Sequence, residues 1–438
     1  MRFHHRLRLL LCLLGAIDFA ICGRLGGAAN AYTLSTLHTF CSLENCADGY
    51  NPIPDLLLDK SGNLYGTTYN GGTIGNGVVF ELVRDNGNNT WSFHVIHTFC
   101  SKHNCTDGGS PQSGLIIDKD GNLYGTTIGG WNGGVAFELS PPAAGKKWNY
   151  KLLHSFCPNG NIYCRQGDGS PAQLTYAGAA AGLPYDGVSA LYGVSGGGAY
   201  NEGLIFKLAP KPGTSKWVEK VLYNFCPLSS CPDGSSPHQM LIMDAKGSLY
   251  GTTVQGGANN SGVAFVLTPN SRGTKWTETT LYSFCALPNC ADGGVPWGSP
   301  VMDATGSLYG TASTGGATGN GVVYKIQPNS ANSRESVMYD FCSQPNCTDG
   351  ADPRSTLVLN ASGTLYGVTL GGGLWGEGNV FELNGSLQTL YDFCSLPNCT
   401  DGQNPYAGVI MDGSGNLFGT TIGGGWNNQI GSVFELSP

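Results

Sequence analysis

Cysteine and aspartate recur together along this chain, and both side chains can carry chemistry. Paired cysteines can form disulfides or bind a metal as thiolates, and carboxylates can bind cations or hydroxyl groups. Fourteen of the sixteen cysteines fall into seven pairs, each followed within a few residues by Asp-Gly. The pairs lie about 50 to 70 residues apart, a period typical of propeller and array repeats. The seven pairs are Cys41/Cys46, Cys100/Cys105, Cys157/Cys164, Cys226/Cys231, Cys285/Cys290, Cys342/Cys347 and Cys394/Cys399.

The cysteine pairs predict local disulfides. Four residues separate the members of each pair, or six in the third copy. An even, paired set in an exported chain indicates oxidised cysteine. A zinc site would need ligands from two different repeats, and no histidine recurs beside the pairs. We therefore expect seven disulfides, one within each pair, and neither a metal site nor a cofactor.

The repeated aspartates could form a rim of seven carboxylates that binds a cation or a polyhydroxyl ligand. The alternative is that each one accepts backbone N–H groups inside its own turn, as Asp before Gly commonly does. Because catalysis needs one differentiated pair rather than seven equal copies, we interpret the set as structural. The aspartates are Asp48, Asp107, Asp168, Asp233, Asp292, Asp349 and Asp401.

Glycine clusters farther along each copy differ in their aromatic content. Trp131, Trp375 and Trp426 follow or interrupt three of these clusters, and Tyr69 precedes another. An indole in a glycine-rich polar loop can stack on a sugar ring or on the apolar surface of a partner. Packing against the neighbouring repeat is an open alternative. We predict these four residues as ligand-binding positions.

Each copy contains four short strand signals that must position these loops. In the second copy they cover residues 115–118, 123–128, 135–139 and 148–156. A tight turn, Asp118 to Asn122, joins the first two strands. Its sequence resembles a calcium-binding loop, but the distal glutamate of such a loop is missing. We therefore interpret the segment as a turn. In the fourth strand, histidine occupies a slot that tyrosine fills in four other copies, which favours packing over catalysis. The histidines are His38, His97 and His154.

The two ends of the repeat array complement each other. Seven sets of first, second and third strands begin near Ile53, Ser113, Ala172, Gln239, Ser299, Ser355 and Ala407. A lone fourth strand, residues 33–40, precedes them, and the chain stops after a third strand, residues 432–436. The sequence therefore predicts an all-β, seven-bladed β-propeller of four-stranded blades, whose ring is closed by the N-terminal strand joining the last blade. An open solenoid would leave that strand unpaired.

Composition and the first residues limit the function classes. Charged residues make up only 12% of the chain and the net charge is −8, which offers no broad basic surface for nucleic acid. A basic start, an apolar run and the small residues around Ala31 predict a signal peptide over residues 1–31, cleaved near Ala31, followed by a single repeat domain over 32–438. No later segment could span a bilayer as a helix. We expect a secreted, monomeric protein.

The repeat wording resembles the GloVer-type tandem repeat of exported bacterial proteins. It is carried by Leu-Tyr-Ser-Phe at residues 281–284, Asn-Leu-Tyr-Gly-Thr-Thr at residues 122–127, the Gly-Gly clusters and Val-Phe-Glu-Leu. The resemblance covers essentially the whole chain after the signal. It implies a propeller with no assigned catalytic residues. It also implies a surface anchor, which this chain does not show after Pro438, so we expect release.

Two function classes stay open at this stage. The first is an exported binding or scaffold propeller that recognises carbohydrate or protein on the face carrying the cysteine loops. The second is a propeller hydrolase, lyase or lactonase acting at the central channel. No isolated Glu, His or Lys constellation and no nucleophile motif was recognised, which favours binding over catalysis. The third copy differs from the others by a wider cysteine spacing and an Ala/Gly-rich insertion over residues 176–187.

Overall fold

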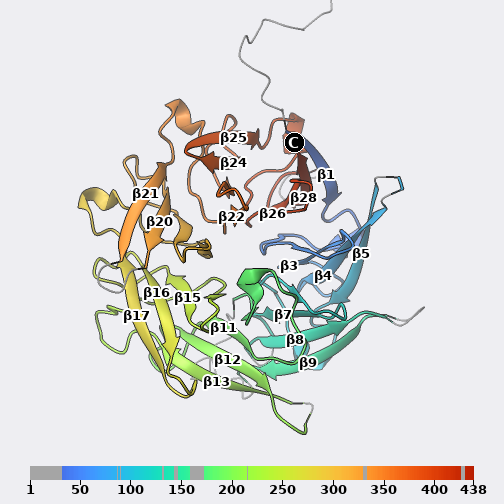
Figure 1. The fold of residues 1–438 in the computed structure, drawn as a ribbon. Coiled ribbons are helices and arrows are strands. Elements are labelled where there is room, and N and C mark those ends of the chain that lie inside the picture. Colours follow the sequence, from blue (N-terminus) through green and yellow to red (C-terminus); the bar gives the residue numbers. More distant parts are fainter. Residues whose placement is uncertain are drawn as a thin grey trace, which may run out of the picture. The chain divides into compact units, whose positions relative to one another are not determined.

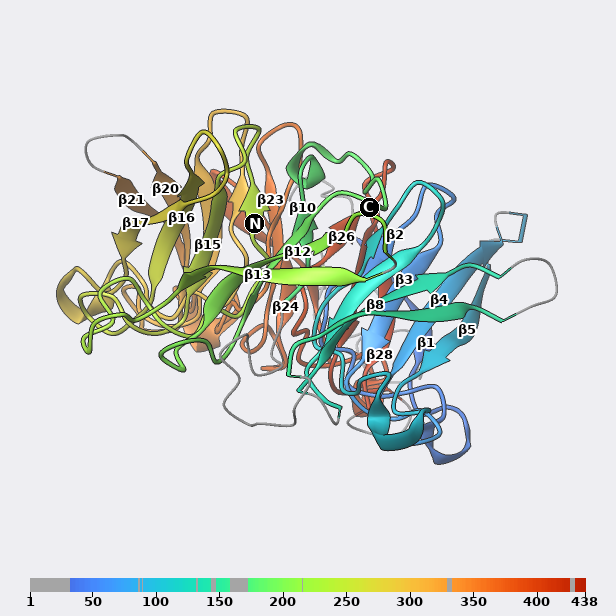
Figure 2. The same ribbon diagram turned by 90° about the horizontal axis from the view of Figure 1, so that it is seen from below.

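A computed structural model describes residues 32–85, 87–88, 90–130, 133–142, 147–157, 172–214, 216–328, 333–425 and 430–438. The compact unit Tyr32–Pro438 contains seven four-stranded antiparallel sheets, arranged as blades around a ring (Figure 1). Seen edge-on, the connections between strands gather at the two faces of this ring (Figure 2). The predicted fold class, a seven-bladed β-propeller, is confirmed.

The first three blades follow one another in chain order, each from its first to its fourth strand. Blade one contains β2 (Leu57–Leu58), β3 (Leu64–Thr68), β4 (Val78–Asp85) and β5 (Thr90–Thr98). Blade two contains β6 (Ile116–Ile117), β7 (Leu123–Thr127), β8 (Val135–Ser140) and β9 (Asn149–Ser155). Blade three contains β10 (Thr175–Tyr176), β11 (Leu191–Ser195), β12 (Leu204–Pro210) and β13 (Trp217–Asn224).

The next three blades repeat this arrangement, and the last is completed by the other end of the chain. Blade four contains β14 (Ile242–Met243), β15 (Leu249–Thr253), β16 (Val263–Pro269) and β17 (Trp276–Ser283). Blade five contains β18 (Val301–Met302), β19 (Leu308–Ala312), β20 (Val322–Gln327) and β21 (Arg334–Asp340). Blade six contains β22 (Val358–Leu359), β23 (Leu365–Thr369), β24 (Asn379–Asn384) and β25 (Ser386–Asp392). Blade seven contains β26 (Ile410–Met411), β27 (Leu417–Thr421), β28 (Ser432–Ser437) and β1 (Thr33–Thr39).

Pairing of β1 with β28 closes the ring. The two strands are antiparallel, with Thr33 opposite Ser437 and Thr39 opposite Ser432. The ladder continues into the next loop, where Phe40 N donates to the carbonyl of Gly431 at 3.1 Å. The closure predicted from the complementary ends is therefore confirmed. It covers the edge of β28, which would otherwise be free to pair with another chain.

The first strand of each blade is shorter than the sequence suggested. The pattern in the second copy predicted residues 115–118, but β6 covers only Ile116 and Ile117. Asp118 belongs instead to the turn, because its N–H donates to the carbonyl of Asn122 at 3.0 Å and its carboxylate accepts the N–H groups of Asp120 and Asn122 at 2.9 Å each. The turn interpretation of this segment agrees with that geometry.

Aromatic contacts between neighbouring blades make up the core. A phenylalanine just after the fourth strand of one blade lies edge-on or tilted against an aromatic ring on the third strand of the next, as Phe40 does with Phe80 at 5.3 Å between ring centroids. Six more such pairs occur around the ring. They are Phe99/Phe137, Phe156/Phe206, Phe225/Phe265, Phe284/Tyr324, Phe341/Phe381 and Phe393/Phe434.

The insertion in the third copy crosses the central channel. It joins β10 to β11 and contains a short 3₁₀ turn, η3 (Ala179–Ala181), drawn near the middle of the ring in Figure 1. Its far part is fixed to blade two, because Tyr185 N donates to the carbonyl of Ile117 and the Tyr185 ring is buried against Tyr124. Ala179 lines cavities shared with the first strands of blades one and two and, separately, of blades four and five. The insertion therefore lies across the channel at the end where first and second strands connect.

Half-buried glutamates lie between blades three, four and five. Glu278 on β17 lies near the Asp233 carboxylate of the preceding loop, and Glu335 on β21 lies near Asp292. Burial raises the pKa of both glutamates to about 7, and each neighbouring aspartate adds to the shift. Unfolding would release both side chains into water, where a glutamate titrates near 4.5.

Removing the closing strand should destabilise the ring. A variant lacking residues 32–40 leaves the edge of β28 unpaired, so we expect aggregation or a much lower melting temperature than for the parent. A variant lacking only residues 1–31 is the control. Size-exclusion chromatography and thermal unfolding measure both. A strand-deleted protein that stays monomeric and melts like the control would contradict the closure.

The glutamates predict that stability falls as the pH rises. Between about pH 4.5 and 7 the unfolded chain releases these protons before the folded chain does, so the free energy of unfolding decreases through this window. Glutamine cannot ionise, so the double variant Glu278→Gln, Glu335→Gln should melt higher than the parent at about pH 8 and lose part of the pH dependence. Glu44→Gln, at an exposed position, is the control. Equal melting curves for parent and double variant at pH 8 would refute this.

Candidate functional site

The cysteine loops and the glycine loops lie on the same face of the ring. The cysteine loop joins one blade to the next, and the glycine loop joins second and third strands. In blade one, Gly72 N donates to the carbonyl of Cys46 at 2.9 Å. The same bond recurs in four other blades, from Gly257, Gly316, Gly373 and Gly425. The two kinds of loop are therefore bonded to each other in these five blades, and we call the face that carries them the cysteine-loop face.

Six of the seven predicted disulfides are present. Each closes its own loop, and none joins two repeats in the described part of the chain. The bonded pairs are Cys41–Cys46, Cys100–Cys105, Cys226–Cys231, Cys285–Cys290, Cys342–Cys347 and Cys394–Cys399. In the third copy Cys157 is disulfide-bonded, and Cys164 lies outside the described residues.

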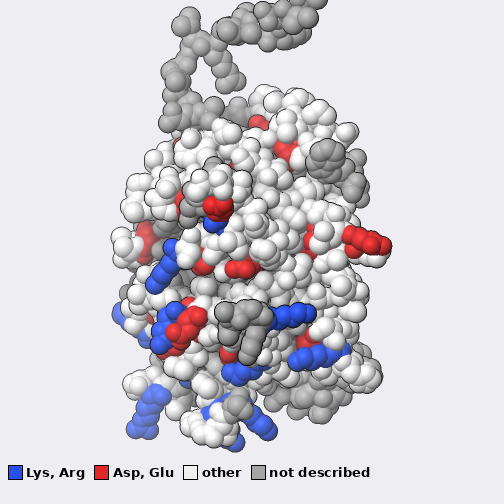
Figure 3. All heavy atoms as spheres, turned by 90° about the vertical axis from the view of Figure 1, so that its right-hand side faces the viewer, with Lys and Arg blue, Asp and Glu red and all other residues white. Residues whose placement is uncertain are grey.

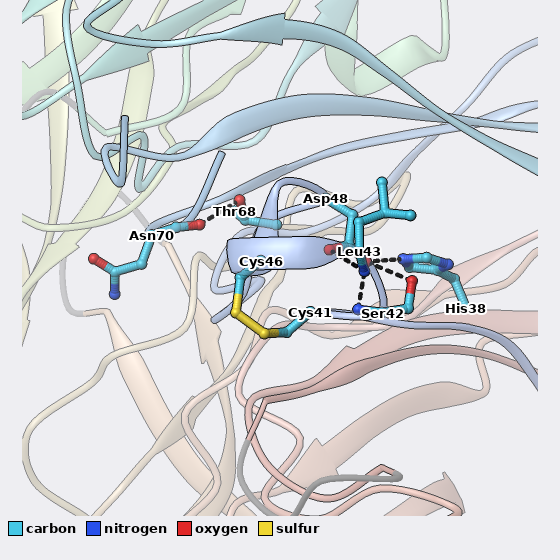
Figure 4. A network of polar contacts seen from close by, with 8 residues as sticks. All are labelled: His38, Cys41, Ser42, Leu43, Cys46, Asp48, Thr68 and Asn70. Atoms are coloured by element: carbon cyan, nitrogen blue, oxygen red, sulfur yellow. Dashed lines mark hydrogen bonds and ion pairs between the residues drawn. A yellow bond between two sulfur atoms is a disulfide. The ribbon is translucent and has the colours of Figure 1, made fainter. Parts of the chain in front are cut away.

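The repeated aspartate is the hydrogen-bond acceptor of the cysteine loop. Figure 4 shows it in the first copy, where the Asp48 carboxylate accepts from the N–H and hydroxyl of Ser42 at 2.9 and 2.8 Å and from Leu43 N at 3.2 Å. His38 Nε2 lies 3.1 Å from the same carboxylate, and its ring stacks on Phe93 of the next blade at 3.7 Å. Burial opposes ionisation, but the bonds from His38 and Ser42 hold the pKa of Asp48 below its usual value.

The other described aspartates also accept backbone N–H groups of their loops, although His97 Nε2 lies 3.6 Å from Asp107, which is too far for a hydrogen bond. In four later copies a tyrosine hydroxyl takes the place of the histidine, as Tyr282 does at 2.7 Å from Asp292. All six are buried, with exposed fractions between 0 and 7%. Their carboxylates therefore face their own loops rather than solvent, which supports a structural role. They are Asp48, Asp107, Asp233, Asp292, Asp349 and Asp401; Asp168 lies outside the described residues.

The four predicted aromatic positions have different surroundings. The Trp375 side chain is 55% exposed, which leaves its indole open to a ligand. Tyr69 is half-buried. Trp131 and Trp426 lie outside the described residues. The predicted contact arc can therefore be placed only at blades one and six.

Sequence reasoning missed a second set of differing residues, at the channel mouth. A proline before the first strand recurs in all seven copies, and in six of them it lies four residues after the repeated aspartate, so that the residue after it lies at the channel mouth. That residue is different in every one of these copies. The mouth residues are Ile53, Gln112, His238, Trp297, Arg354 and Tyr406. Alignment of the copies on the proline would have found them.

Four mouth residues from consecutive blades contact one another. The His238 ring lies 5.2 Å from the Trp297 ring, and the Arg354 guanidinium lies 5.7 Å from the Trp297 ring centre. Arg354 Nε donates to Asp352 Oδ1 at 2.8 Å, and the Tyr406 hydroxyl lies near the guanidinium. The bond to Asp352 raises the pKa of Arg354. These contacts give the arc of blades four to seven a connected surface that is both aromatic and polar.

A small polar cavity lies inside the mouth. It holds about 60 Å³ and is lined by five of the mouth residues, excluding Trp297, and by the backbone that begins the first strands. Asp55 is its one described carboxylate. Asp55 Oδ1 accepts from Gly408 N at 2.7 Å, and burial raises the pKa of Asp55.

Metal binding, membrane insertion and binding to a charged partner find little support among the described residues. No group of three or more His, Cys, Asp or Glu side chains suited to a metal ion occurs among the described residues. In the same part of the chain, no helix is long and apolar enough for a membrane span. On the side of blades one and two, Lys and Arg side chains are mixed with acidic ones and most of the surface is uncharged (Figure 3).

Asp292→Asn should destabilise the fold. Oδ1 accepts from Leu287 N at 3.0 Å, and Oδ2 accepts from Ala286 N and the Tyr282 hydroxyl, so an amide nitrogen at either position would face a donor. The expected loss is about 1–3 kcal/mol in the free energy of unfolding, measured by denaturant titration. The exposed Asp120→Asn is the matched control and should change little. Equal losses in both variants would contradict a structural role for the rim.

Comparison with solved structures finds proteins of distant sequence. A putative 6-phosphogluconolactonase from Bacteroides uniformis is 11% identical, with a TM-score of 0.46, covering 82% of this chain and 95% of that one. Trypanosoma rangeli sialidase is 9% identical, with a TM-score of 0.41, covering 89% and 54%. An endo-arabinase from Bacteroides thetaiotaomicron is 13% identical, with a TM-score of 0.35, covering 69% and 96%. No curated protein matches the chain.

A protein-family model describes the repeat itself. The Gloeobacter/Verrucomicrobia repeat matches residues 26–186, 172–344 and 237–438, which together include every blade. These matches agree with the resemblance seen in the repeat wording. The chain belongs to the Gloeobacter/Verrucomicrobia repeat family.

Proposed function

We propose that this protein is an exported binding propeller that recognises carbohydrate at the channel mouth on its cysteine-loop face. One observation carries the proposal. Blades that agree closely elsewhere place six different side chains at one position around the mouth, and four of these contact one another. The six blades fold alike whichever side chain stands at this position, so folding does not account for the differences. Differentiation at a shared, partly open position is therefore best explained by a ligand.

The mouth residues have the chemistry that sugars require. Trp297 and Tyr406 offer aromatic surface to the apolar face of a sugar ring. His238 and Gln112 supply hydrogen-bond donors and acceptors for hydroxyl groups, and both are exposed. The exposed Trp375, on the same face in the glycine loop of blade six, would extend the contact away from the channel. The predicted partners Trp131, Trp426 and Tyr69 would do so in their own loops.

The six disulfides support export. Disulfides persist in oxidising compartments and are rare in the cytosol. A signal over residues 1–31 with cleavage near Ala31 remains part of the proposal, as does a monomeric state. Hydrolysis is the less supported alternative, because glycosidases usually need two carboxyl groups and the described lining of the mouth cavity offers Asp55 alone.

A glycan array followed by titration tests the proposal. We expect Trp297→Ala to weaken binding of the best array ligand at least about tenfold, equivalent to about 1.4 kcal/mol, and Trp375→Ala to weaken it less. Melting temperatures should stay near that of the parent, which separates binding from folding. A parent protein that binds no glycan, or a Trp297→Ala variant that binds like the parent, would contradict the proposal. Loss of binding only in Trp375→Ala would move the site to the glycine loops.

A further inference from the structure

The channel mouth contains one permanent positive charge. Among the described residues that line its cavity, Arg354 is the only lysine or arginine. The other copies place Ile, Gln, His, Trp or Tyr at this position, so the charge belongs to blade six alone. A repeat that tolerates so many side chains here does not need a cation for its fold.

Arg354 is held in place by a partner that is also peculiar to its copy. Asp352, two residues earlier, accepts from Arg354 Nε at 2.8 Å, and the equivalent residues in the other described copies are neutral. They are Asn51, Ser110, Ser236, Val295 and Asn404. The two side chains are 32% and 33% exposed, and ion pairs this open contribute little to stability. The pair is therefore better explained by its effect on the orientation of the guanidinium.

In this orientation the Arg354 guanidinium still has N–H groups that can donate to a ligand at the channel mouth. A guanidinium carries five N–H donors, of which Asp352 receives the one on Nε. The two terminal nitrogens carry the other four, and together they match the two oxygens of a carboxylate. Trp297 beside the guanidinium, at 5.7 Å, restricts its movement further. Arg354 is thus an oriented cation rather than a freely moving one.

The cavity accepts a small group and not a whole sugar. Its volume of about 60 Å³ suits a small polar group such as a carboxylate better than a pyranose ring. The blade-three insertion lies across the other end of the channel, so a polymer cannot pass straight through. A ligand must therefore approach from the cysteine-loop face and insert one protruding group.

We propose that the channel mouth selects acidic sugars, and that Arg354 pairs with the carboxylate of a uronic acid unit while Trp297 and Tyr406 contact its ring. This inference rests on the proposed carbohydrate binding and adds the class of ligand. Asp352 acts as a positioning residue, because it holds the guanidinium without touching the sugar.

Titration with matched oligosaccharides tests the inference. The probes are a trisaccharide of galacturonic acid, the corresponding trisaccharide of galactose, and a sulfated form of the galactose trisaccharide. We expect the parent to prefer the galacturonic acid probe at least about tenfold over the neutral probe, and the preference to shrink as the salt concentration rises. Arg354→Gln should lower binding of the acidic probe to the neutral level, and Arg354→Lys should restore part of it. Asp352→Asn should weaken the acidic probe more than the neutral one.

Lys119→Gln is the control because it removes the same charge from an exposed position at the other end of the channel. It should leave the preference unchanged. If Arg354→Gln fails to fold, Arg354→Lys and Asp352→Asn decide the question. Equal binding of acidic and neutral probes, tighter binding of the sulfated probe, or acidic binding untouched by Arg354→Gln would overturn the inference while the proposed function stands. Absence of binding to every glycan on the array would overturn both.

Discussion

Contact between a glycine of one blade and a proline of the next limits the spacing of the blades at six junctions of the ring, as the described residues show. The glycine precedes the third strand and has a positive φ, as in Gly378 with φ 89°. A Cβ there would lie 2.2 Å from the carbonyl oxygen of Thr369 and 2.8 Å from Cδ of Pro405 in the next blade. Only glycine permits this approach. The ring closure uses the same contact, between Gly431 and Pro52.

This contact explains how a uniform frame can present a varied site. Because the proline is fixed against the preceding blade, the residue that follows it always starts at the same height in the channel wall. Its side chain can then change without moving the backbone. The cysteine loop adds to the constraint, since its disulfide and its buried aspartate tie both sides of the loop that leads to the proline. Structural repetition and functional variation therefore occur at neighbouring positions of the same loop.

Much of the fold could be predicted because seven copies repeat the same information. The strand order, the cysteine pairs and the glycine clusters recur in the copies. A strand or loop that is hard to assign in one copy can therefore be assigned from the others. The closure followed from counting strands at the two ends. The first strands were predicted too long because an apolar run such as residues 115–117 does not show where hydrogen bonding to the next strand begins.

The candidate site was harder to predict, for a physical reason. The tryptophans of the glycine loops attracted notice because an indole in a polar loop is unusual, whereas His238 or Gln112 looks ordinary in any single copy. Only the structure shows that five of the six mouth residues line one shared cavity and that Trp297 lies beside both His238 and Arg354. The path of the blade-three insertion was also hard to predict. Its sequence is that of a loop rich in Ala and Gly, and its path across the channel depends on Tyr185 packing onto another blade.

The most direct test of the account is to observe which tryptophan a bound ligand touches. The chain contains eight tryptophans, and fluorotryptophan labelling gives each a separate fluorine NMR signal, assigned by single substitutions. If the mouth is the binding site, ligand addition should shift the Trp297 signal most, with a smaller change at Trp375. A ligand that shifts Trp375 and leaves Trp297 unchanged would contradict the central claim that the channel mouth is the binding site.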